Sequence, residues 1–351
     1  METSPELYNS RFMKAVRGEP VDRPPVWMMR QAGRYMAQYR AVREQTSFLD
    51  LCHNPKLCAD VMATAVNVLG VDAAIIFSDL LPILVPLGFS LEFGPGHGPI
   101  IHNPVNEPED LARVVELDRL DELQFVMETV IETRRLLPAD MPLIGFAGAP
   151  FTLASYVLEG GASRSFAKTK RFMYMHPSAF DDLMALLSRA ITKYLQGQIA
   201  AGAQVVQLFD SWIGCLSPED YKQYVFKHVS SILTEVERTA PAIHFGTGNP
   251  ALIPLMTQAG GTVIGVDWRL ELADAWNLVD ANSNNRRRSI QGNLDPALLL
   301  TNPDNITARV VKMLDSVKNR QGLIVNLGHG IIKDTPVENA ISLVNAVQNY
   351  R

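Results

Sequence analysis

Val205-Val206-Gln207-Leu208-Phe209-Asp210-Ser211-Trp212 is an apolar run that ends abruptly in polar residues. Near-continuous apolarity over this length is typical of a strand that is buried on both faces of a parallel sheet. Seven further short apolar runs begin at Val26, Ala73, Leu143, Ala242, Val263, Ser289 and Leu323. The chain therefore predicts eight strands, and most of them should belong to one parallel sheet.

Helical patterns separate most of these runs. Pro177 opens a stretch in which apolar residues recur every three or four positions, and Gly202 lies near its end. We expect another helix over about 108–137, a third after Ser217 and a last one after Pro336. Eight strands alternating with helices predict a (β/α)8 TIM barrel in the α/β class. A doubly wound open sheet is the alternative, but no Gly-x-Gly-x-x-Gly motif follows the first run.

The length fits one large domain. A chain of 351 residues exceeds the roughly 250 of a simple barrel. A passage rich in proline and glycine suggests an inserted loop or hairpin over about 80–105. Because no linker or fixed-period repeat divides the chain, we expect a single domain over residues 1–351.

The composition limits the kinds of partner and the cellular compartment to be expected. Thirty-two basic and 37 acidic residues give a net charge of −5, which argues against a nucleic-acid partner. Three cysteines cannot all pair, so a reducing compartment is expected, with Cys52 and Cys58 as buried or half-buried thiols. No run reaches the ~18 apolar residues of a membrane span, and the N-terminus lacks the features of a signal peptide. We expect a cytoplasmic protein without a membrane partner, with a processed plastid protein as the alternative.

Four arginines follow the first run within fourteen residues: Arg30, Arg34, Arg40 and Arg43. Active sites of barrels lie at the C-terminal ends of the strands, and Arg30 directly follows this one. Gly33 would let a ligand approach the backbone closely. Since guanidinium groups pair with carboxylates and phosphates, the loop predicts a cationic mouth for a polyanionic ligand. A solvated helix face explains Arg40 and Arg43 equally well.

Two titratable groups stand at other strand ends. Asp79 follows an apolar run, where burial would raise its pKa and a nearby arginine would lower it. His329 lies between two glycines, which suits a close approach of the backbone to a ligand. An acid that caps the next segment and a structural histidine are the alternatives. Tyr156 and Ser211 could each offer a hydroxyl, and no residue spacing indicates a metal site.

The segment Arg23–Tyr35, Arg-Pro-Pro-Val-Trp-Met-Met-Arg-Gln-Ala-Gly-Arg-Tyr, resembles the N-terminal signature of the uroporphyrinogen decarboxylase family. Gly145–Leu153 resembles the second signature, and Ile76–Asp79, Gln207–Ser211 and Asn326–Gly330 resemble three more segments in the same order. The resemblance implies a (β/α)8 barrel, usually a homodimer, that uses no cofactor or metal. Such an enzyme removes CO2 from the four acetate side chains of uroporphyrinogen III and yields coproporphyrinogen III for haem and chlorophyll synthesis.

The resemblance also implies roles for single residues. Asp79 would be the central catalytic acid, and Arg30 a catalytic residue and one candidate proton donor, with Asp79 itself or a water as rivals because guanidinium is a weak acid. The residues implied to contact the substrate or line its pocket are Arg30, Gln31, Ala32, Gly33, Arg34, Arg43, Asp79, Phe146, Tyr156, Ser211 and His329.

Two other functions are open at this stage. A zinc-dependent methyltransferase of the same superfamily would need a His-x-Cys pair, but Gly246 stands two residues after His244. A tetrapyrrole carrier would bind the same substrate without releasing CO2.

Overall fold

The computed structural model describes residues 4–94 and 98–350, so Met1–Thr3 and positions 95–97 of the expected insertion lie outside the described residues. Seven parallel strands follow one another around the central sheet in chain order. They are β1 (Ala74–Ile75), β4 (Leu143–Gly148), β5 (Val205–Asp210), β6 (Ala242–Gly246), β7 (Val263–Gly265), β8 (Ser289–Leu294) and β9 (Leu323–Leu327). Every residue of these strands except Phe209 is buried, as the apolar runs predict.

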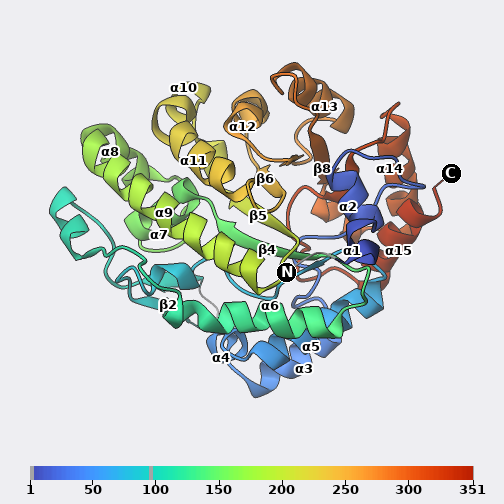
Figure 1. The fold of residues 1–351 in the computed structure, drawn as a ribbon, viewed down its shortest axis with the longest axis horizontal. Coiled ribbons are helices and arrows are strands. Elements are labelled where there is room, and N and C mark those ends of the chain that lie inside the picture. Colours follow the sequence, from blue (N-terminus) through green and yellow to red (C-terminus); the bar gives the residue numbers. More distant parts are fainter. Residues whose placement is uncertain (1–3, 95–97, 351) are drawn as a thin grey trace.

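Helices surround the sheet (Figure 1). Among them are α5 (Pro55–Leu69), α6 (Gln124–Leu136), α9 (Pro177–Ala201), α11 (Phe226–Val236), α12 (Ile253–Ala259), α13 (Leu272–Ala281), α14 (Pro303–Asp315) and α15 (Val337–Gln348). The others are α1 (Pro5–Tyr8), α2 (Arg11–Val16), α3 (Ala37–Gln45), α4 (Phe48–Cys52), α7 (Pro150–Glu159), α8 (Ala167–Met175) and α10 (Pro218–Asp220). Three predicted helices are confirmed: α9 ends before Gly202, Ser217 accepts a hydrogen bond from the Asp220 amide at the start of α10, and α15 follows Pro336.

The first predicted strand is not a full strand. Only Val26 forms a bridge, parallel to Val325 of β9. Pro24 and Pro25 lack the N–H groups that a strand ladder needs. The chain then turns at Arg30, whose φ of +62° lies in the left-handed region. The expectation of eight regular strands is therefore wrong in this position, and a short bridged segment takes the place of the eighth strand.

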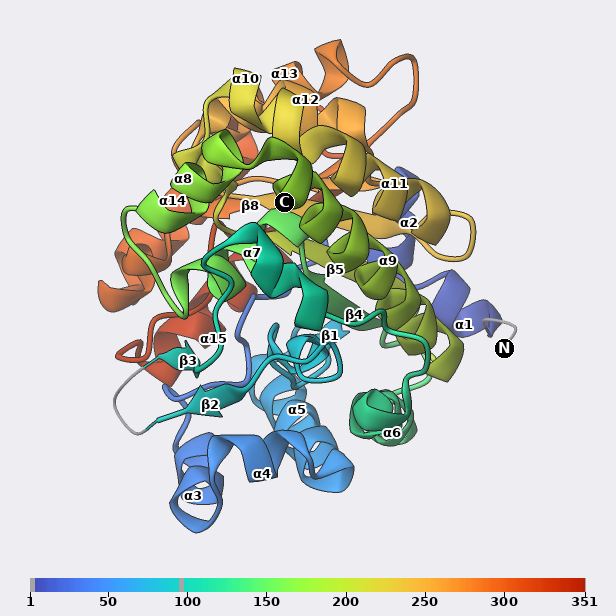
Figure 2. The same ribbon diagram turned by 90° about the vertical axis from the view of Figure 1, so that its left-hand side faces the viewer.

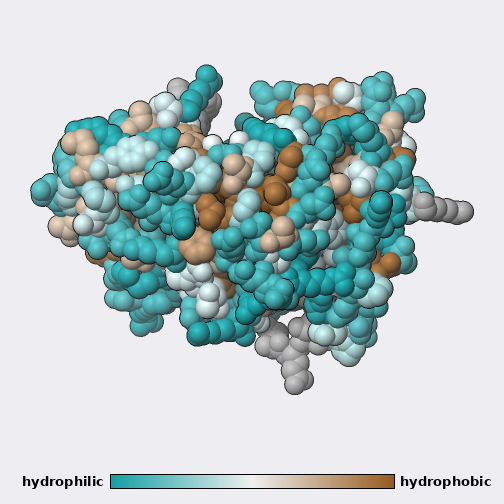
Figure 3. All heavy atoms as spheres, turned by 90° about the horizontal axis from the view of Figure 1, so that it is seen from above, coloured by the Kyte–Doolittle hydropathy of each residue, from teal (hydrophilic) through white to brown (hydrophobic). Residues whose placement is uncertain are grey.

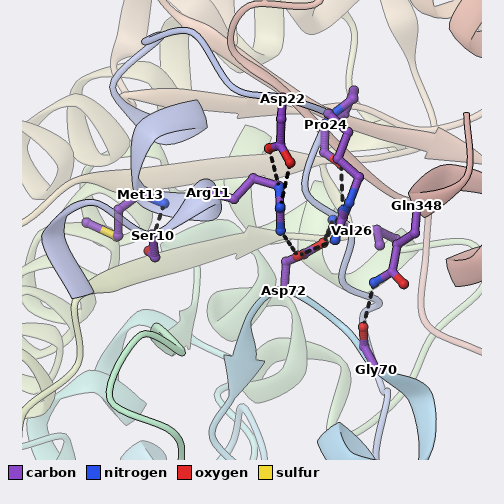
Figure 4. Close-up of polar contacts among 10 residues, drawn as sticks. Ser10, Arg11, Met13, Asp22, Pro24, Val26, Gly70, Asp72 and Gln348 are labelled. Carbon is purple, nitrogen blue, oxygen red and sulfur yellow. Dashed lines mark hydrogen bonds and ion pairs between the residues drawn. The ribbon is translucent and has the colours of Figure 1, made fainter. Parts of the chain in front are cut away.

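Asp72 joins this bridged segment to the chain that leads into β1 (Figure 4). Its backbone N–H donates to the carbonyl of Val26 at 2.8 Å, and its carboxylate accepts from the Val26 amide at 2.9 Å. Arg23 donates to both carboxylate oxygens at 2.7 and 2.9 Å, and Arg11 adds a bond of 3.0 Å. Because Val26 also bridges to β9, the ring of the barrel is closed through Asp72.

The segment after β1 departs from the barrel pattern. Strands β2 (Leu91–Phe93) and β3 (Pro99–Ile101) pair antiparallel and lie apart from the central sheet (Figure 2). The helix expected from residue 108 is wrong in its first half, because 108–113 and 121–123 are short 3-10 turns and α6 begins only at 124. In the segment between these turns, Lys193 of α9 donates to the carbonyls of Leu117 and Asp118 at 2.7 and 2.9 Å.

The surface and the cysteines can be compared with what the composition predicts. The face seen from above is largely hydrophilic, with hydrophobic patches near its centre (Figure 3). No helix in the described ranges is long and apolar enough to cross a membrane. Cys52 and Cys58 are buried free thiols, as expected, and the Cys58 thiol donates to the Leu51 carbonyl at 3.0 Å.

Candidate active site

Polar residues gather where the parallel strands end. Asp79 follows β1, Ser211 follows β5, Arg269 comes four residues after β7, and His329 follows β9. Because the carboxyl ends of parallel strands meet at one end of a barrel, these side chains share its mouth. Arg30 reaches the same mouth from the loop after the Val26 bridge.

Arg30 is held in an unusual conformation. Its backbone adopts a left-handed φ of +62°, and its side chain runs directly over Gly330. A methyl group built on Gly330 would lie 2.3 Å from Cδ of Arg30, so no side chain fits at Gly330 while Arg30 keeps this course. Gly33 is restricted as well, because a methyl group there would lie 3.2 Å from the Arg30 carbonyl oxygen. The two glycines thus leave the space that the backbone and side chain of Arg30 occupy.

Gln31 anchors the arginine loop from the inside. Its side chain is fully buried, donates to the Ala73 carbonyl at 3.2 Å and accepts from the Met28 amide at 3.3 Å. Tyr35 donates to the Gln31 carbonyl at 2.6 Å. Ala32, next in the chain, is also buried. The expected contact residues 30–33 thus divide into an exposed Arg30 and neighbours that fix its loop.

Asp79 is half-buried beside this arginine. Burial raises the pKa of the Asp79 carboxyl above its ordinary range, while the hydrogen bond from the Leu81 amide and the charge of Arg30 act in the opposite direction. The Leu81 N–H donates to Oδ1 of Asp79 at 3.0 Å and fixes the orientation of the carboxyl group. Asp79 therefore caps the following turn, and its carboxyl group also lies within electrostatic reach of Arg30.

His329 is neutral at physiological pH in this surrounding. Burial, helped by the charges of Arg30 and Arg269, lowers its pKa to about 4. The Gly330 amide donates to Nδ1 of His329 at 2.8 Å, so Nδ1 is the unprotonated nitrogen. It follows that Nε2 carries the proton, which makes His329 a neutral hydrogen-bond donor.

Aromatic rings come from β4, α7, β5 and the turn after β5. Tyr156 stacks on Trp212 with ring centroids 4.0 Å apart, and Phe146 meets Phe209 edge-on at 5.5 Å. Burial raises the pKa of the Tyr156 hydroxyl; the charge of Asp79 adds to this effect and Arg30 opposes it. Tyr156 therefore lies within electrostatic reach of both groups. Ser211 is half-buried between Asp210 and Trp212.

The other arginines of the first loop take different positions. Arg34 and Arg43 lie near Tyr39 on α3, where their charges offset part of the rise that burial causes in the pKa of the tyrosine. Arg43 also donates to the Thr46 carbonyl. Arg40 donates to the carbonyls of Arg34 and Tyr35 at 3.1 and 2.9 Å, which makes it a support of the loop.

Two features were not singled out from the sequence. Asp210 and His244 form a fully buried pair whose Oδ2 and Nε2 are 3.8 Å apart. Nδ1 of His244 lies 3.2 Å from the Met256 carbonyl, whereas Nε2 of His244 and both oxygens of Asp210 have no hydrogen-bond partner among the described residues. Asp267 binds Arg269, whose guanidinium lies 4.6 Å from the ring centre of Trp268. Asp267-Trp268-Arg269 directly follows an apolar run, and this position was the available signal. In residues 4–94 and 98–350, no cluster of three or more metal-ligating side chains is present.

The fold and the site together define a barrel protein whose mouth joins an acid, arginines and a neutral histidine, an arrangement suited to a polycarboxylate substrate. The chain belongs to the uroporphyrinogen decarboxylase family, whose model matches residues 7–350.

Curated relatives carry the same family name over nearly the same length. "Uroporphyrinogen decarboxylase" of Chloroflexus aurantiacus is 46% identical over 345 residues, which cover 97% of this chain and 96% of the relative. The protein of the same name from Koribacter versatilis is 43% identical over 344 residues, with the same two coverages. Among solved structures, a methyltransferase from Methanosarcina mazei covers 96% of this chain and 97% of its own, with a TM-score of 0.79 at 20% identity. That likeness supports the barrel fold alone.

Proposed function

We propose that this chain is a carboxy-lyase that decarboxylates uroporphyrinogen in tetrapyrrole biosynthesis. The observation that carries the proposal is the family match over residues 7–350 together with the juxtaposition of Arg30, Asp79 and His329 at the barrel mouth. In finer detail, the four acetate side chains of uroporphyrinogen III would become methyl groups, which gives coproporphyrinogen III.

The chemistry needs an electron sink, and the pyrrole ring can supply one. A proton added to the pyrrole α-carbon makes the ring cationic. The bond between the acetate methylene and its carboxylate then breaks, CO2 leaves, and the bonding electrons enter the ring. A proton added to the methylene forms the methyl group, and the ring carbon gives back its first proton. Each cycle thus consumes one proton net.

Asp79 is suited to stabilise the cationic pyrrole intermediate. A carboxylate that is already oriented by the Leu81 amide can accept hydrogen bonds from pyrrole N–H groups without rearranging. Burial makes the isolated carboxylate costly, so a cationic ring beside it is stabilised more than a neutral one. Asp79, Arg30 or a water would supply the proton.

The remaining residues would bind and orient the eight carboxylates and the macrocycle. Arg30 offers a guanidinium in a fixed direction, and His329 offers the Nε2 proton to a carboxylate without adding charge. Gln31, Ala32 and Gly33 would hold the arginine loop in place. The other groups proposed to contact or line the substrate site are Arg34, Arg43, Phe146, Tyr156 and Ser211. We further propose a homodimer that works in the cytoplasm.

The test is anaerobic incubation of the chain with uroporphyrinogen III, followed by oxidation and chromatography of the products. Seven-, six-, five- and four-carboxylate species should appear without any added cofactor. The Asp79→Asn variant serves as the matched control and should leave the substrate nearly unchanged. An eight-carboxylate substrate that is bound but not converted by the unaltered chain would favour a carrier and refute the proposal. Light scattering of the unaltered chain reports whether the protein is a dimer.

A further inference from the structure

Asp267 is a buried carboxylate that organises the end of β7. Its side chain is 6% exposed. One oxygen accepts from the Thr247 hydroxyl at 2.6 Å and the Gly248 amide at 2.7 Å, and the other accepts from the Arg269 amide at 3.0 Å. The guanidinium of Arg269 completes the set by donating from Nη1. With these donors in place, Asp267 is a rigid anchor for Arg269.

The anchored arginine lies beside the proposed site. Its Cζ atom is 4.6 Å from the ring centre of Trp268. Trp268 in turn packs against Gly328, where a methyl group would lie only 2.7 Å from Cε3 of the indole. Gly328 directly precedes His329. Trp268 therefore joins Arg269 to the backbone on one side of His329, at Gly328, whereas Arg30 lies over Gly330 on the other side.

One edge of this guanidinium is available to a ligand. Nη1 is engaged by Asp267 and by the Thr247 hydroxyl at 3.2 Å, but within the described part of the chain Nε and Nη2 make no hydrogen bond. The side chain of Arg269 is 42% exposed. A guanidinium held by one nitrogen, with its Nε–Nη2 edge open, is arranged to bind a carboxylate through two parallel bonds.

The bond to Asp267 leaves Arg269 able to bind a second carboxylate. It is one carboxylate shared among a hydroxyl and two backbone amides as well as the arginine, and the arginine's other edge points away from that bond. The charge of Arg269 still reaches the site, because it contributes to the lowering of the His329 pKa. Fixing a side chain in advance also reduces the conformational entropy that ligand binding would otherwise cost.

We propose that Arg269 is a second carboxylate-binding residue, which holds a peripheral carboxylate of the substrate across His329 from Arg30. The inference rests on the proposed function, since it requires a substrate with several carboxylates around its rim. Arg269 would act in binding and orientation, and the chemical step would remain with the groups around Asp79.

The test compares Arg269→Gln and Arg269→Lys with Arg238→Gln, a matched change at an exposed arginine that pairs only with Glu235 among the described residues. For Arg269→Gln, KM for anaerobic uroporphyrinogen III should rise about tenfold with kcat nearly unchanged, because a charge-assisted pair is lost from the bound states alone. KM of Arg269→Lys should lie between those of Arg269→Gln and the unaltered chain, since lysine keeps the charge but cannot form the two parallel bonds. Arg238→Gln should match the unaltered chain.

A binding measurement separates this inference from the proposed function. Oxidised uroporphyrin III is not turned over, and its fluorescence reports binding at equilibrium. Its affinity should fall about tenfold in Arg269→Gln and should depend less on salt than in the unaltered chain. An unchanged KM and affinity in Arg269→Gln, or a fall in kcat alone, would overturn the role of Arg269. Failure of the unaltered chain to release CO2 would instead overturn the proposed function while the porphyrin titration still tests Arg269.

Discussion

Replacing Gly330 with alanine should disable the site by displacing Arg30. The new methyl group would lie 2.3, 2.6 and 2.9 Å from Cδ, Cγ and Nε of Arg30. Ordinary contact begins at 3.4 Å, so Cδ would have to retreat by about 1.1 Å. A displacement of about 1 Å in a catalytic or binding group can cost roughly a hundredfold in rate, equivalent to about 2.7 kcal/mol in the transition state. We therefore expect kcat/KM to fall about a hundredfold in Gly330→Ala.

The assay is anaerobic decarboxylation in single variants and in a double-mutant cycle. Gly98→Ala is the matched control, because a methyl group there meets its nearest neighbour among the described residues at 3.9 Å, and it should retain full activity. In an Arg30→Ala background, Gly330→Ala should cause little further loss, since the group that it displaces is already absent. An equal hundredfold loss in both backgrounds would refute the explanation through Arg30.

Three more predictions follow from individual contacts. Asp79→Asn keeps an acceptor for the Leu81 amide but removes the charge, so turnover should fall about 10²- to 10³-fold while affinity for oxidised uroporphyrin is retained; loss of both together would contradict an electrostatic role. Asp72→Asn should lower the free energy of unfolding in urea by about 1–3 kcal/mol, because Arg23 loses its charged partner at the closure of the barrel; an unchanged midpoint would contradict this. His329 has a pKa of about 4 in the folded chain against an ordinary 6.5. Between these pH values the unfolded state binds more protons than the folded state. His329 therefore makes the free energy of unfolding rise with pH from about 4 to 6.5. In His329→Gln the slope of the urea unfolding free energy over this window should be smaller, and an identical slope would remove His329 as its source.

The sequence predicts the regular parts of this fold well because the same physical cause acts all along the chain. A strand buried on both faces must be apolar, so β4, β5, β6 and β9 are visible as runs. The exceptions have local causes that a run of apolar letters does not display. Consecutive prolines reduce the Val26 run to one bridge, and the carbonyls of 117 and 118 are bound by Lys193, which lies more than seventy residues away.

The sequence predicts which residues form the site but not which structural role each of them has. The positions of Arg30, Asp79 and His329 at strand ends follow from the barrel itself. Sequence does not distinguish Arg30 from its neighbour Gln31, and only the folded chain reveals that Gln31 is turned inward onto Ala73. The contact between Arg30 and Gly330 joins residues three hundred positions apart, so it depends on closure of the ring. Arg269 was not found for the same reason, because its significance comes from Trp268 packing on Gly328.

The most direct measurement counts the CO2 released and the uroporphyrinogen III consumed by the unaltered chain, anaerobically and without added cofactor. If the barrel mouth acts on each acetate with the pyrrole ring as electron sink, the count should reach four CO2 for each molecule fully converted, with one proton taken up for each CO2. Consumption of no substrate, or CO2 release that begins only when a cofactor is supplied, would contradict the account.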